Sequence, residues 1–215
     1  MKKLSLVSLL LLVVVLFVSM AAFSDTLTLT GVGPSNTFSG PGETPYAYPY
    51  VFTINGNPNI LLLCDDWMDT IYVGESWQAD LQTTSLAASS NYLNVTNPAA
   101  DYNEAAWLYT QLNGSNDVAV NAAIWAVFDP AVVPYLGNAP DAQILYDNAI
   151  NYAGVYTPNV GFYTPIVGTQ TEGGRPQQFL VTTPESPMSL MLTADFLGLL
   201  ALLGLNRKRG WELNI

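Results

Sequence analysis

Residues 50–64 read YVFTINGNPNILLLC, and this stretch decides the fold. Aromatic and β-branched residues at 50–54 and an apolar run at 60–64 have the composition of β-strands. Between them, residues 55–58 (NGNP) contain an Asn-Gly pair, which is the strongest short signal for a hairpin turn. The stretch therefore predicts two antiparallel strands joined by a tight turn.

Further strands are expected on both sides of this hairpin. Residues 26–30 (TLTLT) alternate polar and apolar side chains, and residues 31–45 are rich in Gly, Pro and Ser, as loops are. The remaining segments with strand composition are 71–73, 159–167 and 177–182.

The middle of the chain has a helical character instead. Alanine and other apolar residues recur there at helical spacing, with Asn116 or Asp117 and then Asp141 as candidate N-caps. The segments concerned are 77–92, 102–112, 118–128 and 141–153. The order of β, then α, then β elements, without a repeat of fixed period, predicts an α+β fold in which a helical lobe is inserted into an antiparallel β-sheet or barrel.

The N-terminus carries the three parts of a secretory signal peptide. Lysines at 2–3 precede an apolar stretch at 4–18, and the small residues Ala22 and Ser24 occupy the −3 and −1 positions of a cleavage site. We expect a signal peptide at 1–24, export across the inner membrane and cleavage by signal peptidase. The alternative is an uncleaved N-terminal anchor helix.

A second apolar segment lies near the C-terminus. Residues 188–205 (MSLMLTADFLGLLALLGL) would span roughly 27 Å as a helix, enough for the hydrocarbon core of a bilayer. Asp195 near its middle costs about 2.5–3.5 kcal/mol on insertion. The basic run at 207–209 keeps the following end cytoplasmic. We expect a transmembrane helix at 188–205 and a short cytoplasmic tail at 210–215; the alternative is an amphipathic helix docked on the domain.

The domain between these two ends, residues 25–182, is strongly acidic. The interval 25–187 holds one cation, Arg175, and fifteen Asp and Glu residues, so its net charge is near −14. Such a charge repels nucleic acid phosphates, which argues against nucleic-acid binding. The sequence has no histidine and one cysteine, Cys64, which excludes Ser-His-Asp and Cys-His catalysis, the usual zinc sites and an internal disulfide. We expect no catalytic residues.

The C-terminal segment resembles a known sorting signal. Pro184, Glu185, Ser186 and Pro187, the apolar segment and the basic run of Arg207, Lys208 and Arg209 together resemble the tripartite PEP-CTERM signal over residues 183–209. In that family an exosortase, a membrane transpeptidase-like enzyme, handles the tail, and the proteins are associated with bacteria that produce exopolysaccharide. The family's Pro-Glu-Pro is here Pro-Glu-Ser-Pro. The resemblance implies a chain that is first anchored in the membrane and then reaches the cell surface or is secreted.

The domain itself is similar to uncharacterised members of the same PEP-CTERM group, which implies an exported protein without an assigned activity. The matching segments are 50–53 (YVFT), 64–66 (CDD), 74–77 (GESW), 104–109 (EAAWLY), 123–129 (AIWAVFD), 163–166 (YTPI) and 176–180 (PQQFL).

A more distant similarity links residues 64–66 (CDD) and 120–125 (VNAAIW) to the thioester domains of Gram-positive surface adhesins. In those domains a Cys and a Gln form an internal thioester that acylates an amine. The Gln position of this sequence holds Asn121, whose side chain is one methylene shorter, opposite Cys64. We therefore expect a shared fold without the covalent chemistry, and a covalent adhesin with a Cys64 thioester stays open as an alternative.

Two further groups of side chains are candidates for binding. Asp65, Asp66 and Asp69 crowd one short segment and predict a calcium site, against the alternative of a solvated acidic loop. A carboxylate pair would also suit a glycan-active enzyme. Trp67 and Trp77 border loops and are expected to be exposed for sugar stacking, whereas tryptophans 107 and 125 and the Cys64 thiol are expected in the core. The sequence thus favours a non-enzymatic surface or matrix protein that contacts exopolysaccharide.

Overall fold

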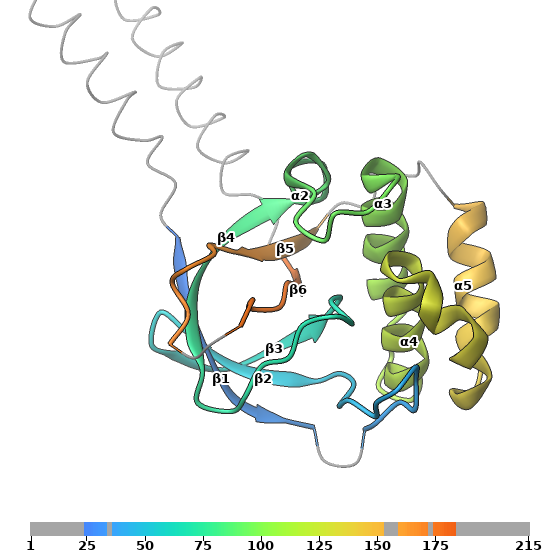
Figure 1. Cartoon of the computed structure of the whole chain (residues 1–215), viewed down its shortest axis with the longest axis horizontal. Coiled ribbons are helices and arrows are strands. Elements are labelled where there is room, and N and C mark those ends of the chain that lie inside the picture. The colour runs from blue at the N-terminus through green and yellow to red at the C-terminus, as the bar shows by residue number, and fades with distance from the viewer. Residues whose placement is uncertain (1–23, 34–35, 153–158, 172–173, 184–215) are drawn as a thin grey trace, which may run out of the picture.

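The computed structural model describes residues 24–33, 36–152, 159–171 and 174–183. Within them, six antiparallel strands close into a barrel in the order β1-β2-β3-β6-β5-β4. The strands are β1 Asp25–Val32, β2 Tyr50–Ile54, β3 Asn57–Cys64, β4 Ser76–Thr83, β5 Val160–Pro165 and β6 Phe179–Thr182. Helices pack along one side of this barrel (Figure 1).

The hairpin predicted at residues 50–64 is confirmed as β2 and β3. Asn55 and Gly56 have φ angles of 49° and 82°, and two consecutive positive values are what a type I′ turn requires. Tyr50 pairs with Leu62 across the hairpin. The side chains of β2 alternate between buried and half-buried, so one face of the hairpin enters the core.

Strand β4 replaces the first part of a predicted helix. Residues 77–92 were expected to be helical, but Ser76–Thr83 pairs with β1 on one side and β5 on the other and so closes the barrel. Trp77 and Ala79 are buried and Gln78 between them is exposed, which is the alternation of a strand. Pairing on both edges overrides the helical propensity of this segment. The strand predicted at 71–73 is also wrong, because these residues lie in the loop before β4.

All described helices lie between β4 and β5, so the predicted inserted helical lobe and the α+β class are confirmed. The lobe consists of α2 Thr84–Ser90, α3 Pro98–Tyr109, α4 Asp117–Phe128, the 3₁₀ helix η1 Pro130–Asn138 and α5 Ala142–Asn151. Asn116 and Asp141 occupy the N-cap positions of α4 and α5, but neither side chain makes a capping hydrogen bond. The helices predicted at 118–128 and 141–153 are therefore present, and Asn116 and Asp141 are at the predicted cap positions without the capping hydrogen bonds.

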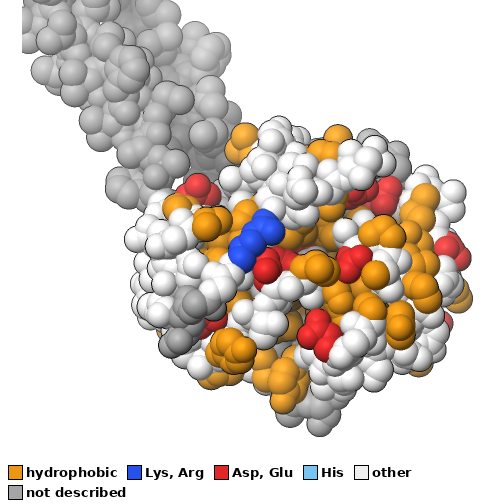
Figure 2. Space-filling view, in the orientation of Figure 1, with side chains coloured by type: hydrophobic (Ala, Val, Ile, Leu, Met, Phe, Trp, Pro, Cys, Tyr) orange, Lys and Arg blue, Asp and Glu red, His pale blue; other side chains and the backbone are white. Residues whose placement is uncertain are grey.

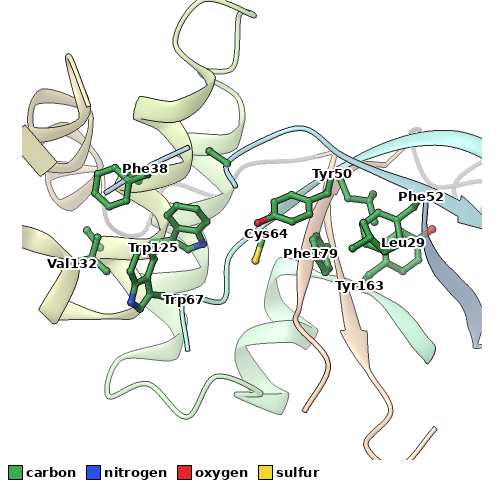
Figure 3. Packing of buried hydrophobic residues seen from close by; sticks show 14 of the residues in the cluster. Leu29, Phe38, Tyr50, Phe52, Cys64, Trp67, Trp125, Val132, Tyr163 and Phe179 are labelled. Carbon is green, nitrogen blue, oxygen red and sulfur yellow. The ribbon is translucent and has the colours of Figure 1, made fainter. Parts of the chain in front are cut away.

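The core joins barrel and helical lobe through aromatic side chains. In the barrel, Phe52 and Phe179 meet edge to face with centroids 4.8 Å apart. Between barrel and lobe, Trp67 and Trp125 meet at 5.1 Å, beside Phe38 (Figure 3). Trp125 is 1% exposed, as expected, but Trp67 is 7% exposed and Trp77 1%, so the expectation that these two are exposed is wrong. Both rings are needed to fill the core.

The predicted membrane and sorting elements lie outside the described residues. They comprise the signal segment up to residue 23, the motif from Pro184 to Pro187, the helix at 188–205, the basic run at 207–209 and the tail at 210–215. Among the helices that the structure does describe, none has both the length and the apolar character needed to cross a bilayer.

Candidate binding cleft at the end of strand β3

Strand β3 ends in a run of buried residues, starting with Cys64. The thiol has no exposed surface and donates a hydrogen bond to the backbone carbonyl of Asp66 at 3.2 Å. Burial, followed by the charges of Asp66 and Asp65, raises the pKa of this thiol well above its usual range. A buried, protonated thiol is a poor nucleophile, so Cys64 acts as a core residue.

The structure brings the predicted pair Cys64 and Asn121 together, but not through the thiol. Asn121 lies one turn into α4 and is fully buried. Its Nδ2 donates to the backbone carbonyl of Cys64 at 2.8 Å, and its Oδ1 accepts from the backbone N–H of Tyr48, also at 2.8 Å. The carboxamide thus clamps helix α4 to the end of β3 and to the segment before β2, and both of its ends are occupied.

Asp65, the next residue, is fully buried, and neither of its carboxyl oxygens has a hydrogen-bond partner in the described structure. Burial and then the neighbouring charge of Asp66 raise the pKa of Asp65 well above its usual range. A small cavity of about 60 Å³ lies beside it, lined by Leu93 and Phe128 among others. The surroundings favour a neutral carboxyl group at this position.

Asp66 and Asp69 form a carboxyl pair next to Asp65. Asp66 Oδ1 accepts the backbone N–H groups of Met68 and Asp69 at 3.0 and 3.2 Å, whereas its Oδ2 has no partner. Burial, and after it the charge of Asp69, raises the pKa of Asp66 to about 7. Asp69 Oδ2 lies 3.6 Å from Arg175 Nε. One loop therefore presents a carboxyl group that titrates near neutrality beside a carboxylate that has an ion-pair partner.

Arg175 is the one Lys or Arg among the described residues. In Figure 2 the blue of Lys and Arg appears at one place, with red acidic and orange apolar side chains around it. Its guanidinium lies 3.9 Å from the ring centroid of Tyr92 and donates to the backbone carbonyl of that residue. The side chain is thus fastened to α2's C-terminal loop and to Asp69 at once. Arg175 supports the acidic loop from one side.

Gln177 supports the same loop from beneath, and sequence reasoning missed it. Its Nε2 donates to the backbone carbonyl of Asp66 at 3.1 Å and to that of Asp69. Its Oε1 has no partner, although the side chain is only 7% exposed. The adjacent Gln178, by contrast, is fully used: it accepts from the Tyr102 hydroxyl at 2.9 Å and donates to Thr164 at 2.6 Å. The sequence shows two adjacent glutamines before a strand, but it does not show which one contacts the acidic loop and which one is bound in the core.

Some of these side chains line a cleft of about 430 Å³. The loop around Tyr46 forms one wall and the loop around Tyr72 the other, and these two rings are 48% and 62% exposed. Its floor is made by Asp66, Asp69, Trp67, Trp125 and Gln177. The tyrosine walls were not anticipated, because Tyr46 follows a Gly- and Pro-rich loop that has no periodic pattern and Tyr72 was predicted to lie in a strand.

The predicted calcium ligands are brought only partly together. Asp66 and Asp69 line the cleft, whereas Asp65 lies on the side of the small cavity. In the part of the chain that the structure describes, no three His, Cys, Asp or Glu side chains converge as a metal site would require. Calcium binding at this loop stays a prediction.

Comparison of the chain with protein-family models, with curated proteins and with solved structures gives no match. The fold and the cleft therefore carry the functional argument by themselves. They define a closed six-stranded barrel with an inserted helical lobe, and a cleft of aromatic walls and carboxyl and amide floor at the end of β3.

Proposed function

We propose that this chain is an exported surface or extracellular-matrix protein, sorted by an exosortase, whose acidic domain binds exopolysaccharide without transforming it. The address rests on the signal-like segment at 1–24 and on the resemblance of residues 183–209 to the PEP-CTERM tail. The binding role rests on the cleft at the end of β3.

One observation carries the binding proposal: the residues that line one cleft include exposed tyrosines and side chains whose oxygens lack hydrogen-bond partners. Tyr46 and Tyr72 flank the cleft, and Asp66, Asp69 and Gln177 on its floor each carry such an oxygen. A sugar offers an apolar ring face for aromatic side chains and many hydroxyl donors for acceptors. A concave site with a few convergent polar groups is the general form of a ligand site.

The proposal is tested by calorimetric titration of the purified chain, in neutral detergent, with β-linked oligosaccharides such as cellotetraose and N-acetylchitotetraose. We expect binding that Tyr72→Ala weakens by about tenfold, because stacking and apolar contact with one ring contribute about 1–2 kcal/mol. Tyr135→Ala is the matched control, since Tyr135 is 37% exposed on η1 and does not line the cleft. Equal affinity of both variants, or no heat with any saccharide, contradicts glycan binding in this cleft.

A glycan-active enzyme is the second candidate, and the titration of Asp66 favours it. A carboxyl group with a pKa near 7 beside a second carboxylate, Asp69, is the acid and base combination that glycoside hydrolysis uses. Release of reducing ends from the same oligosaccharides, lost in Asp66→Asn and kept in Asp147→Asn on α5, would replace the binding proposal with this one.

The covalent adhesin receives no such support. Asn121 gives its amide N–H to the Cys64 carbonyl, and the thiol is buried and protonated. The intact mass of the purified chain separates the alternatives: an internal thioester would lower the mass by one ammonia and react with methylamine. We expect the full mass and no reaction.

A further inference from the structure

The charged groups that line the cleft are all carboxyl groups. Asp66 and Asp69 lie on its floor and Glu43 is exposed at its rim, and no Lys, Arg or His side chain lines it. The nearest described cation, Arg175, contacts Asp69 but is itself held by Tyr92 and lines the small neighbouring cavity instead. Of the carboxyl groups that line the cleft, Asp69 alone pairs with this cation, so a ligand near Asp66 or Glu43 meets a carboxyl group without a described cationic partner.

Several polar atoms of the residues that line the cleft lack a hydrogen-bond donor. Asp66 Oδ2, Asp69 Oδ2 and Gln177 Oε1 have no hydrogen-bond partner, and each accepts hydrogen bonds when the carboxyl groups are ionised. Gln177 cannot turn its amide around without cost, because its Nε2 is held by the carbonyls of Asp66 and Asp69. An acceptor that stays buried and unpaired destabilises the site, and a ligand N–H group would satisfy it.

The aromatic lining fits a cation as well as a sugar. Tyr46 and Tyr72 expose their rings at the walls, and Trp67 lies at the base against Trp125, with their planes 70° apart. Aromatic faces attract ammonium groups, and an ammonium group supplies three N–H donors at one point. Carboxyl groups, an amide oxygen and rings around one space are thus complementary to a positively charged amine.

We propose that the cleft selects saccharides that carry a free, protonated amine, that is, amino sugars without an acyl group, over neutral and uronic-acid saccharides. The proposal rests on the proposed glycan binding and names the class of ligand for the same site. Uronic acids are repelled by the carboxyl groups, and an N-acetyl group replaces the charged donor with a neutral, bulkier one.

Calorimetric titration of the purified chain with the trimers of glucosamine, N-acetylglucosamine and galacturonic acid tests this selection. We expect the glucosamine trimer to bind at least about tenfold more tightly than the acetylated trimer, since a charge-assisted hydrogen bond contributes about 1.5–3 kcal/mol, and the uronic trimer not to bind. Asp69→Asn should abolish the preference and Asp147→Asn should keep it, because Asp147 is an exposed carboxylate on α5. Higher salt should weaken the binding of the glucosamine trimer more than the binding of the acetylated trimer.

Three outcomes overturn the proposal, and they differ in what they leave standing. Equal affinity for the charged and acetylated trimers contradicts amine selection but leaves glycan binding intact. No binding of any trimer contradicts both. Calcium alone giving heat that Asp69→Asn removes would assign the carboxyl groups to a metal ion and overturn amine selection. Asp69 is a suitable position because its side chain is partly exposed, 21%, so the variant keeps the core unchanged.

Discussion

Replacing Asn121 by alanine should destabilise the domain more than any exposed asparagine could. The side chain is fully buried and makes two hydrogen bonds, from the Tyr48 N–H and to the Cys64 carbonyl, both 2.8 Å long. The Cys64 carbonyl lies in the core, so its loss of a partner costs about 2 kcal/mol, and the half-buried Tyr48 N–H adds about 1 kcal/mol. We expect a loss of about 3 kcal/mol from a total stability of about 5–15 kcal/mol.

The assay is guanidinium unfolding followed by tryptophan fluorescence, because Trp125 lies one turn further along α4. Asn151→Ala is the control: Asn151 is exposed and donates one hydrogen bond, to the Asp147 carbonyl at 2.8 Å, so its loss should stay within about 0.5 kcal/mol. Asn121→Asp keeps the acceptor for Tyr48 and should regain stability at low pH, where a protonated carboxyl group can again donate. If Asn121→Ala costs no more than the control, the carboxamide does not hold helix and barrel together.

Three further predictions concern the same region. Cys64 should resist maleimide in the folded chain and react on unfolding, as intact mass will show; fast native labelling would contradict its burial. Because the folded pKa of Asp66 is raised to about 7, its contribution to stability is complete below about pH 4 and is lost as the pH rises toward 7. The free energy of unfolding, measured from pH 4 to 8, should therefore fall less steeply with pH for Asp66→Asn than for the unchanged chain. The same slope in both would refute the raised pKa. Gly40→Ala places a Cβ 2.3 Å from the Trp67 ring and should cost about 1–3 kcal/mol in thermal unfolding, whereas Gly137→Ala, with open space around it, should not.

The sequence predicted the fold where local chemistry determines the structure. The hairpin turn is signalled by Asn55-Gly56. The helix α4 is signalled by Asn116 before it and by the proline at 130 after it. Both elements are present at the expected residues. Residues 76–83 carry no such signal. The segment SWQADLQT contains alanine, glutamine and leucine, and it becomes a strand only because β1 and β5 offer hydrogen-bonding edges on both sides. A partner that is distant in the sequence cannot be inferred from the segment itself.

For the candidate site, too, the sequence predicted the local features but not the contacts between distant segments. Adjacent Asp65, Asp66 and Asp69 were visible as a cluster, but the turn that sends Asp65 to the inside and Asp66 to the cleft was not. Gln177 is more than a hundred residues away and reaches the loop only because β6 pairs with β3. Tyr46 comes from the loop before β2 and Tyr72 from the loop between β3 and β4. Tertiary structure assembles the cleft, so its composition could not be listed in advance.

The geometry around Cys64 argues against the covalent chemistry that the resemblance to thioester domains left open. A cysteine at a strand end and a carboxamide on the facing helix are both present. With the shorter Asn121, the amide is held by two backbone groups, and the thiol is held by the Asp66 carbonyl. Each reactive group therefore has a structural partner, whereas oxygens of Asp66 and Gln177, which line the cleft, have none. A site built in this way favours recognition by reversible hydrogen bonds and charge over the formation of a covalent bond.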